Sequence, residues 1–272
     1  MKSIILCADD YGLCEPVGAG IRELVVRRCL SAVSCMSSAP AWPEEAALLK
    51  PLRDQIDVGL HFNLTLGFAA PAPGLTTWLK NSLTGQSDLV AVEKAFLQQL
   101  DLFESVWGSP PDFIDGHQHV HVFPGIRHRL LQLISKRYPV GMRPWIRLVT
   151  PPLTGHDAPL KALIVRMLSL GFARNARQAG LDLPRGFAGL YSLSGTADFP
   201  AMMAGWLRHS APGTVVMCHP SLCAEHDPDG IGQARLQEFQ YLRSSAFDDT
   251  CTRLGITLAR FGGPDRYKEK GG

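Results

Sequence analysis

The stretch that decides the fold is Ile4-Ile5-Leu6-Cys7-Ala8-Asp9-Asp10, in which a short apolar run is followed at once by two acids. A continuous apolar run of this length is typical of a strand that is buried on both faces. Three later apolar runs end in the same manner, at His61, His117 and His219. The chain therefore places chemically active side chains at the ends of buried strands.

Strand-like and helix-like segments alternate along the whole chain. The expected strands are 4–8, 32–36, 56–60, 113–115, 146–149, 187–193, 214–217 and 256–258. The expected helices are 16–28, 42–53, 87–107, 125–137, 159–171 and 233–247. Such alternation favours parallel strands joined by crossover helices, and its persistence over 272 residues favours a closed or distorted barrel over an open sheet. We predict one α/β domain over 1–272, a distorted TIM-like (β/α) barrel, with a lid-like insertion at about 66–86.

The composition excludes several classes of protein. Hydrophobic residues make up 46% of the chain, which is enough for a sizeable core. Lys and Arg number 27 against 25 Asp and Glu, and this balance does not indicate a nucleic-acid partner. No apolar run approaches the ~20 residues that span a bilayer. The seven cysteines include no CxxC pair and several lie in apolar runs, so we expect a cytoplasmic protein with buried, reduced thiols.

The carboxyl ends of the strands of a parallel barrel share one face, and that face carries the active site. Each motif alone also has a structural interpretation, because adjacent aspartates cap helices and a single histidine after a strand is often a core residue. His117, His119 and His121 differ, since alternate residues of an extended segment point the same way and three imidazoles have few structural uses. The convergence of these strand ends predicts a metal site or a catalytic site.

One carboxylate and two imidazoles with open positions are typical of a catalytic metal site. The mixed donor set does not decide between Mg²⁺ and Zn²⁺. A second carboxylate beside the cation suggests hydrolysis, in which it takes a proton from water while a histidine opposite protonates the leaving group. Asp9 and Asp10 fit this division of labour, and Asp115 is placed to orient a ligand histidine.

The motifs resemble those of the YdjC/ChbG/HpnK family of carbohydrate deacetylases, in order and spacing, from residue 3 to about 260. The segments that carry the resemblance are Ala8-Asp9-Asp10-Tyr11-Gly12-Leu13, Gly59-Leu60-His61-Phe62-Asn63-Leu64-Thr65, Asp115-Gly116-His117-Gln118-His119-Val120-His121-Val122-Phe123-Pro124 and Cys218-His219-Pro220. The resemblance implies a barrel of the glycoside hydrolase/deacetylase superfamily with one divalent metal ion. It implies removal of N-acetyl groups from an acetylated amino sugar, either an oligosaccharide or a lipid-linked sugar, by attack of a metal-activated water.

The resemblance also implies roles for individual residues. The implied metal ligands are Asp10, His61 and His117, the implied base is Asp9, and the implied acid is His219. The last motif departs from the usual His-Pro-Gly, because Ser221 stands in place of the glycine.

Further residues are candidates for contact with the substrate. His119 and His121 either ligate the metal or bind the sugar, and His121 is the stronger alternative ligand. Tyr11, which replaces the usual Phe of the family, and Asn63 lie beside the presumed ligands. Arg147 either points into the mouth of the site toward the sugar or the acetyl carbonyl, or is a solvated surface residue.

The sequence leaves alternatives open for the binding partners and for the function. Residues 158–177 combine an apolar stripe with several basic side chains, which favours either peripheral contact with an anionic membrane or a barrel helix with a solvated basic edge. A charged fraction of only 19% also permits a homodimer. The alternative functions are a phosphoesterase on the same barrel, which often needs two metals, and a sugar-binding protein that keeps the metal without turnover.

Overall fold

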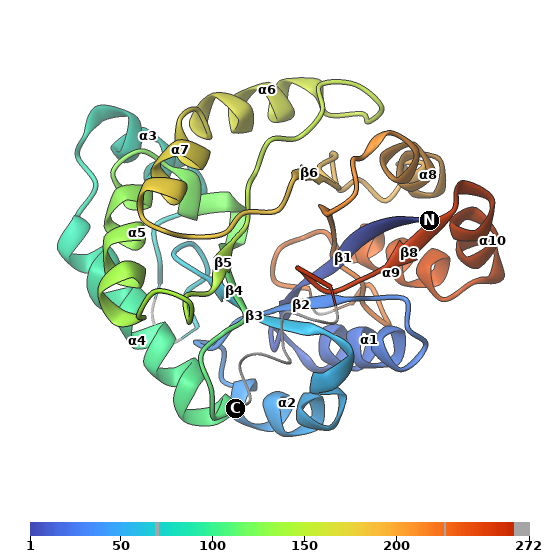
Figure 1. The fold of residues 1–272 in the computed structure, drawn as a ribbon, viewed down its shortest axis with the longest axis horizontal. Coiled ribbons are helices and arrows are strands. Elements are labelled where there is room, and N and C mark those ends of the chain that lie inside the picture. Colours follow the sequence, from blue (N-terminus) through green and yellow to red (C-terminus); the bar gives the residue numbers. More distant parts are fainter. Residues whose placement is uncertain (69–70, 226, 264–272) are drawn as a thin grey trace.

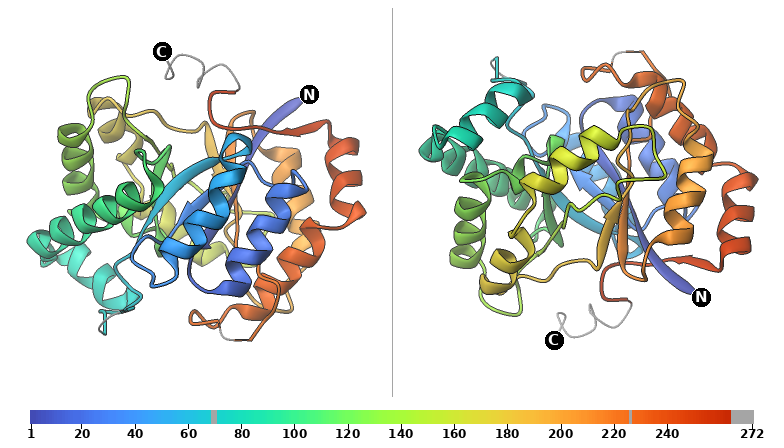
Figure 2. Two further views of the ribbon diagram at one scale, coloured as in Figure 1. Left: turned by 90° about the horizontal axis from the view of Figure 1, so that it is seen from below. Right: turned by 90° about the horizontal axis from the view of Figure 1, so that it is seen from above.

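The computed structural model describes residues 1–68, 71–225 and 227–263. In this part of the chain, parallel strands form one curled sheet in the order β5-β4-β3-β2-β1-β7-β6, with β8 paired to β1. Helices surround the sheet (Figures 1 and 2). The strands are β1 Lys2–Tyr11, β2 Ala32–Cys35, β3 Asp57–Phe62, β4 Phe113–Gly116, β5 Trp145–Ile146, β6 Gly186–Ala188, β7 Thr214–Cys218 and β8 Ile256–Leu258. The distorted α/β barrel predicted from the alternation is confirmed.

The barrel is incomplete between its two edge strands. β5 and β6 stand at opposite ends of the strand order, and no ladder joins them within the described residues. A backbone hydrogen bond from the Ile146 amide to the Asp182 carbonyl oxygen (3.0 Å) ties β5 to the segment that precedes β6. The sheet therefore curls into most of a barrel without closing.

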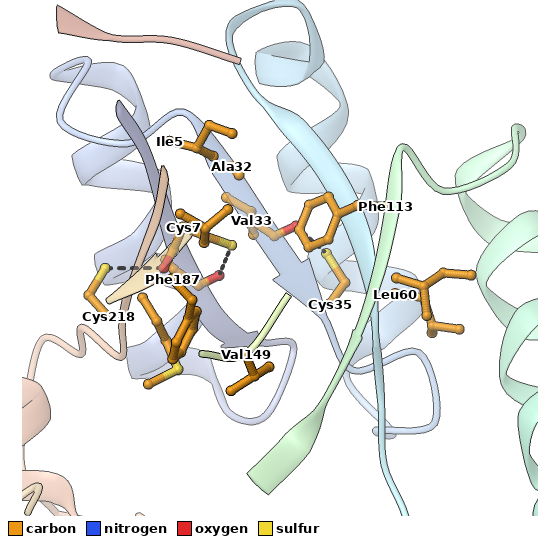
Figure 3. Packing of buried hydrophobic residues seen from close by; sticks show 14 of the residues in the cluster. Ile5, Cys7, Ala32, Val33, Cys35, Leu60, Phe113, Val149, Phe187 and Cys218 are labelled. Carbon is orange, nitrogen blue, oxygen red and sulfur yellow. Dashed lines mark hydrogen bonds between the residues drawn. The ribbon is translucent and has the colours of Figure 1, made fainter. Parts of the chain in front are cut away.

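β1 is central because its apolar run has neighbours on both sides. It pairs with β2, β7 and β8, with Ile5 opposite Val215 and Cys7 opposite Ala32. Figure 3 shows Cys7 among the packed side chains, and the Cys218 thiol donates to its carbonyl oxygen over 3.5 Å. A strand buried on both faces needs continuous rather than alternating apolar residues, which is the pattern of this segment.

The helices follow the strands in the expected rhythm. They are α1 Glu15–Val26, α2 Trp42–Leu49, α3 Leu75–Thr84, α4 Leu89–Trp107, α5 Ile126–Arg137, α6 Pro159–Leu168, α7 Phe172–Gln178, α8 Phe199–His209, α9 Gly232–Leu242 and α10 Ser245–Leu254. Two 3-10 segments, η1 Lys50–Gln55 and η2 His117–Val122, accompany them. In the described part of the chain, no helix is long and apolar enough to cross a membrane.

Several boundaries differ from the sequence prediction. The helix expected over 159–171 ends earlier, and α7 follows after Gly171, whose φ of +77° is left-handed. The strand expected over 187–193 stops at Ala188, because Gly189 has φ +99° and approaches Met217 so closely that any Cβ would clash. The helix expected over 233–247 is divided between α9 and α10.

The segment predicted as a lid, 66–86, contains α3. The indole nitrogen of Trp78 donates to the Leu64 carbonyl oxygen over 3.0 Å, and Ser82 bonds the Pro124 carbonyl oxygen. Residues 69–70 lie outside the described residues. The α3 part of the segment is thus anchored to the loops that follow β3 and η2, and its action as a lid stays a prediction.

Candidate active site

Four strands deliver polar side chains to the same end of the sheet. Asp9 and Asp10 lie near the end of β1, His61 near the end of β3, Asp115 on β4, and His219 directly after β7. His61 and Asp115 stand opposite each other in the parallel register of β3 and β4. The predicted convergence at the carboxyl ends of the strands is therefore present in the structure.

A break in β1 lets both aspartates serve the site. Asp10 has φ +68°, in the left-handed region that non-glycine residues rarely adopt. The register between β1 and β2 shifts at the same point, between Ala8 and Tyr11. Adjacent side chains of a regular strand point to opposite faces, and a bulge re-aims one of them. Asp10 consequently reaches the histidines of β3 and η2, while Asp9 reaches Arg147.

Asp10, His61 and His117 form a compact donor set. Asp10 Oδ1 lies 3.2 Å from His61 Nε2 and 3.1 Å from His117 Nδ1. All three side chains are buried, and one ligand atom from each lies within 4.8 Å of the others. One carboxylate and two imidazoles with positions left open fit a catalytic divalent cation. The structure thus brings together the three residues that the sequence predicts as ligands.

The charges of this donor set are adjusted by its neighbours. Burial alone would raise the pKa of Asp10, but Arg235 and His117 outweigh it and hold that pKa well below its usual range. Burial opposes protonation of His61, yet the Asp115 and Asp9 carboxylates raise its pKa to about 10. The neighbouring charges therefore favour an ionised Asp10 and oppose the effect of burial on His61.

The ring of His61 is held from behind by Asp115. Its Nδ1 lies 2.7 Å from Asp115 Oδ1, and the Ser34 hydroxyl donates to the same oxygen over 2.6 Å. A carboxylate in this place fixes which nitrogen faces the cation. The orienting role predicted for Asp115 agrees with this geometry.

Arg147 lies behind Asp9 rather than in the mouth of the site. Its guanidinium is fully buried, donates to both oxygens of Asp9 over 2.6 Å, and lies 2.5 Å from Asp115 Oδ2. Cys7, Asp9 and Asp115 also lie close enough to resemble a metal cluster, but the guanidinium already provides the positive charge among them. Both sequence interpretations of Arg147, substrate contact and solvated surface, are corrected by these buried ion pairs.

His119 and His121 do not join the donor set. η2 is a short turn with left-handed Gln118 and His119, so the extended spacing assumed from the sequence does not apply. His121 Nε2 lies 3.1 Å from the Arg147 carbonyl oxygen, and its ring meets Phe172 edge-on. Burial lowers the pKa of His121 to about 4 and that of His119 well below its usual value, so both rings are neutral.

Tyr11 and Asn63 have structural partners. The Tyr11 hydroxyl donates to the Glu45 carbonyl oxygen over 2.7 Å and accepts from Arg22. The Asn63 side chain accepts from the Thr65 and Leu66 amides and holds the turn after β3. Both side chains thus support the local structure, and their contact with a substrate stays a prediction.

His219 is nearly buried and is held by Glu238 of α9. Its backbone amide donates to one Glu238 oxygen, and its Nδ1 lies 3.8 Å from the other. The Tyr191 hydroxyl donates to Glu238 Oε1 over 2.6 Å and fixes that carboxylate. The sequence interpretation missed Glu238, which looks like an ordinary helical residue.

Arg235, also on α9, was missed as well. Its buried guanidinium donates to Asp10 Oδ2 over 2.7 Å, to Asp227 Oδ1 over 2.7 Å and to Asp229 Oδ2 over 2.8 Å. The only available signal was the Asp-Pro-Asp-Gly turn at 227–230 followed by a basic helical residue, which is a weak pattern. Arg235 thus connects the metal-ligand candidate of β1 with the chain that follows β7.

Comparisons with known proteins agree with this architecture. A sequence model of the family described as YdjC-like protein matches residues 3–253. A chitooligosaccharide deacetylase from Yersinia enterocolitica serotype O:8 is 26% identical over 275 residues, which cover 96% of this chain and 98% of that protein.

Two solved structures share the fold. A proposed cellobiose-phosphate cleavage protein from Enterococcus faecalis V583 superposes with a TM-score of 0.70 at 19% identity, covering 95% of this chain and 97% of that one. A peptidoglycan N-acetylglucosamine deacetylase superposes with a TM-score of 0.52 at 11% identity, covering 95% of this chain and 85% of that one. At these identities the likeness establishes a common fold.

Proposed function

Because the chain belongs to the YdjC-like protein family, we propose that it is a metal-dependent carbohydrate deacetylase acting on an acetylated amino sugar. The observation that carries this proposal is the buried set Asp10, His61 and His117 beside a separate carboxylate, Asp9. The similarity over nearly the whole length to a chitooligosaccharide deacetylase supports an oligomer of N-acetylglucosamine as the substrate class.

The proposed reaction is hydrolysis of the acetamide. Asp10, His61 and His117 would hold one divalent cation, Mg²⁺ or Zn²⁺. When bound, such a cation would lower the pKa of water and polarise the carbonyl of the acetamide. Asp9 takes the proton of the attacking water, and the two hydrogen bonds from Arg147 hold that carboxylate in place. The water oxygen bonds to the carbonyl carbon, the C–N bond breaks, and acetate and a free amine result.

His219 is proposed to protonate the departing amine. Glu238 accepts the backbone N–H of His219 and so holds this residue at the wall of the site, with the second carboxylate oxygen 3.8 Å from Nδ1. The proton for the leaving nitrogen then comes from a different wall of the site than Asp9. Two groups with opposite tasks are thus held by separate partners, Arg147 and Glu238.

Acetate release tests the proposal. The protein is stripped with a chelator, reloaded with Mg²⁺, Mn²⁺, Zn²⁺ or Co²⁺, and given N-acetylglucosamine, its oligomers and a lipid-linked acetamido sugar. Metal-dependent release from at least one substrate is the expected result. Asp9→Asn should lose this activity while retaining metal affinity. Hydrolysis of phosphoesters without acetate release would favour the phosphoesterase, and sugar binding without any turnover would favour a binding protein.

We also propose that the outer face of α6 contacts an anionic membrane. α6 buries Ala162, Val165 and Leu168 against the barrel, yet its opposite face is also apolar. The exposed side chains of that outer face are Leu160, Leu163, Ile164 and Met167, with Leu170 after the helix. Figure 1 places α6 at the periphery, and the right view of Figure 2 shows it in front of the strands. A surface helix that is apolar on both sides calls for a covering partner.

The charge around this helix favours a lipid surface. Arg166, Arg174 and Arg177 are exposed on α6 and α7, and residues 158–181 contain no acid. Apolar side chains flanked by arginine are typical of helices that lie in the interface of anionic bilayers. Proximity to a bilayer would suit a lipid-linked substrate.

Flotation with vesicles tests the membrane contact. The protein should float with phosphatidylglycerol vesicles and not with neutral phosphatidylcholine vesicles. Met167→Glu should abolish flotation, whereas Leu83→Glu, at an equally exposed position of α3, should not. Absence of flotation would overturn the proposal, and a dimer in light scattering that Met167→Glu dissociates would assign the face to a second copy of the chain.

A further inference from the structure

His61 shows how this site holds an imidazole at both nitrogens. Its Nε2 lies 3.2 Å from Asp10 Oδ1, and its Nδ1 lies 2.7 Å from Asp115 Oδ1. The carboxylate behind the ring accepts the second N–H and thereby leaves the other nitrogen free to act as a ligand. The same requirement applies to any second histidine that faces Asp10.

His117 faces Asp10 with Nδ1, whereas His61 faces it with Nε2. The second nitrogen of His117 lacks a short bond like the one between His61 and Asp115. Nδ1 lies 3.1 Å from Asp10 Oδ1, whereas the buried Nε2 has no hydrogen-bond partner among the described residues. Asp229 Oδ1 lies 3.5 Å from this Nε2. A buried N–H without a partner is unfavourable, so a small closure of this gap would stabilise the site.

Arg235 holds the Asp229 carboxylate beside His117. Arg235 Nη2 lies 2.8 Å from Asp229 Oδ2 and 2.7 Å from Asp10 Oδ2. One guanidinium nitrogen therefore joins the carboxylate in front of His117 to the carboxylate behind it. Asp227 binds the same arginine at Nε over 2.7 Å and makes no contact with His117 that the structure shows.

We propose that Asp229 is a positioning residue of the metal centre, which accepts the Nε2–H of His117 and aims Nδ1 at the cation. Asp229 then stands to His117 as Asp115 stands to His61. This inference rests on the proposed metal-dependent function. It adds that a residue of the chain after β7 completes a site whose ligands come from β1, β3 and η2.

Metal affinity, rather than activity, is the measurement that tests it. Zn²⁺ binding is measured by calorimetry and the visible absorption of bound Co²⁺ is recorded for the full chain, Asp229→Ala and Asp227→Ala. The two variants remove ion pairs of the same arginine, but only Asp229 approaches His117. We expect Asp229→Ala to weaken Zn²⁺ binding about 10–100-fold and to change the Co²⁺ spectrum. Asp227→Ala should weaken binding less than about threefold.

Asp229→Asn is a conservative variant that separates loss of the hydrogen bond from loss of the charge. Asp229→Asn keeps an oxygen that accepts the His117 N–H, and it should recover most of the affinity lost in Asp229→Ala. If Asp229→Ala does not fold, Asp229→Leu, which keeps the side-chain volume but has no acceptor, is compared with Asp227→Leu, and only the former should change the Co²⁺ spectrum. Equal losses in the two series, unchanged affinity in Asp229→Ala, tighter binding in that variant, or no metal binding by the native chain would overturn the inference. Metal binding without acetate release would instead count against the proposed function alone.

Discussion

Arg147→Met is expected to destabilise the protein by about 3–5 kcal/mol, the usual cost of breaking a buried ion pair from one side. The guanidinium is fully buried between two carboxylates, with contacts of 2.6 Å to each oxygen of Asp9 and 2.5 Å to Asp115 Oδ2. Methionine fills most of the volume and leaves both carboxylates without this counter-charge. Domains are stable by about 5–15 kcal/mol, so the variant should fold but unfold at much lower urea concentration.

Asp9→Asn should change the stability in opposite directions in the native protein and in the Arg147→Met variant. In the native background, Asp9→Asn removes one of two partners of Arg147 and should destabilise the protein. In the Arg147→Met background, the same change removes a buried carboxylate that has lost its guanidinium partner, and it should stabilise the protein. The interaction energy from the double-mutant cycle should reach about 1–3 kcal/mol.

Urea unfolding followed by far-ultraviolet circular dichroism provides the assay. A chelator is present throughout, because bound metal would add its own stabilisation to the folded state. Additive effects, with Asp9→Asn destabilising both backgrounds equally, would refute the reasoning. So would an Arg147→Met variant that loses less than about 1 kcal/mol, since that is below the cost of an uncompensated buried charge.

Three further outcomes are expected. Ser34→Ala removes the hydroxyl that donates to Asp115 Oδ1, so Zn²⁺ affinity by calorimetry should fall about tenfold. Ser38→Ala, at a buried hydroxyl that has no hydrogen-bond partner among the residues that the structure describes, should leave this affinity unchanged. Gly189→Ala forces a Cβ to within 2.3 Å of the Met217 carbonyl oxygen at φ +99°, so Tm in scanning calorimetry should fall by at least about 4 °C, and an unchanged Tm would contradict the close approach. Burial raises the pKa of the Cys7, Cys35 and Cys218 thiols well above the usual value, so iodoacetamide at pH 8 should spare them in the native state and modify the half-buried Cys223, as judged by mass spectrometry of digests.

The sequence predicted the fold because the strands of this protein carry their signal locally. Each buried strand is a short apolar run, and each is followed by turn residues and an amphipathic segment. α8 shows a signal that was present but overlooked, since Asp198 caps the Ala201 amide and Pro200 occupies the first turn. The breaks at Gly171 and Gly189 depend on packing as well as on local preference, which limits what a pattern can reveal.

Some residues of the candidate site could also be predicted from the sequence, and others could not. The convergence of Asp10, His61 and His117 was predictable because each lies at or just after the end of a strand that the sequence marks clearly, and the family resemblance implied their roles as ligands. The arginines that bind the two aspartates were not predictable as partners, since Arg147 and Asp9 are 138 residues apart and Arg235 and Asp10 are 225 apart. His119 is not in the donor set for a local reason, because left-handed residues in η2 replace the assumed extended spacing, and its contact with a sugar stays a prediction.

The ion pair between Arg235 and Asp10 forms only after the ribosome has synthesised most of the chain. Ribosomes add about 5–20 residues per second, so about 11–45 s separate the synthesis of the aspartate from that of its arginine 225 residues later. Until then the β1 carboxylate lacks this partner, and the imidazoles have only part of their surroundings. On the proposed function, uptake of the cation at full affinity would follow completion of the last βα units, because Arg235 is not yet synthesised while the first half of the chain folds.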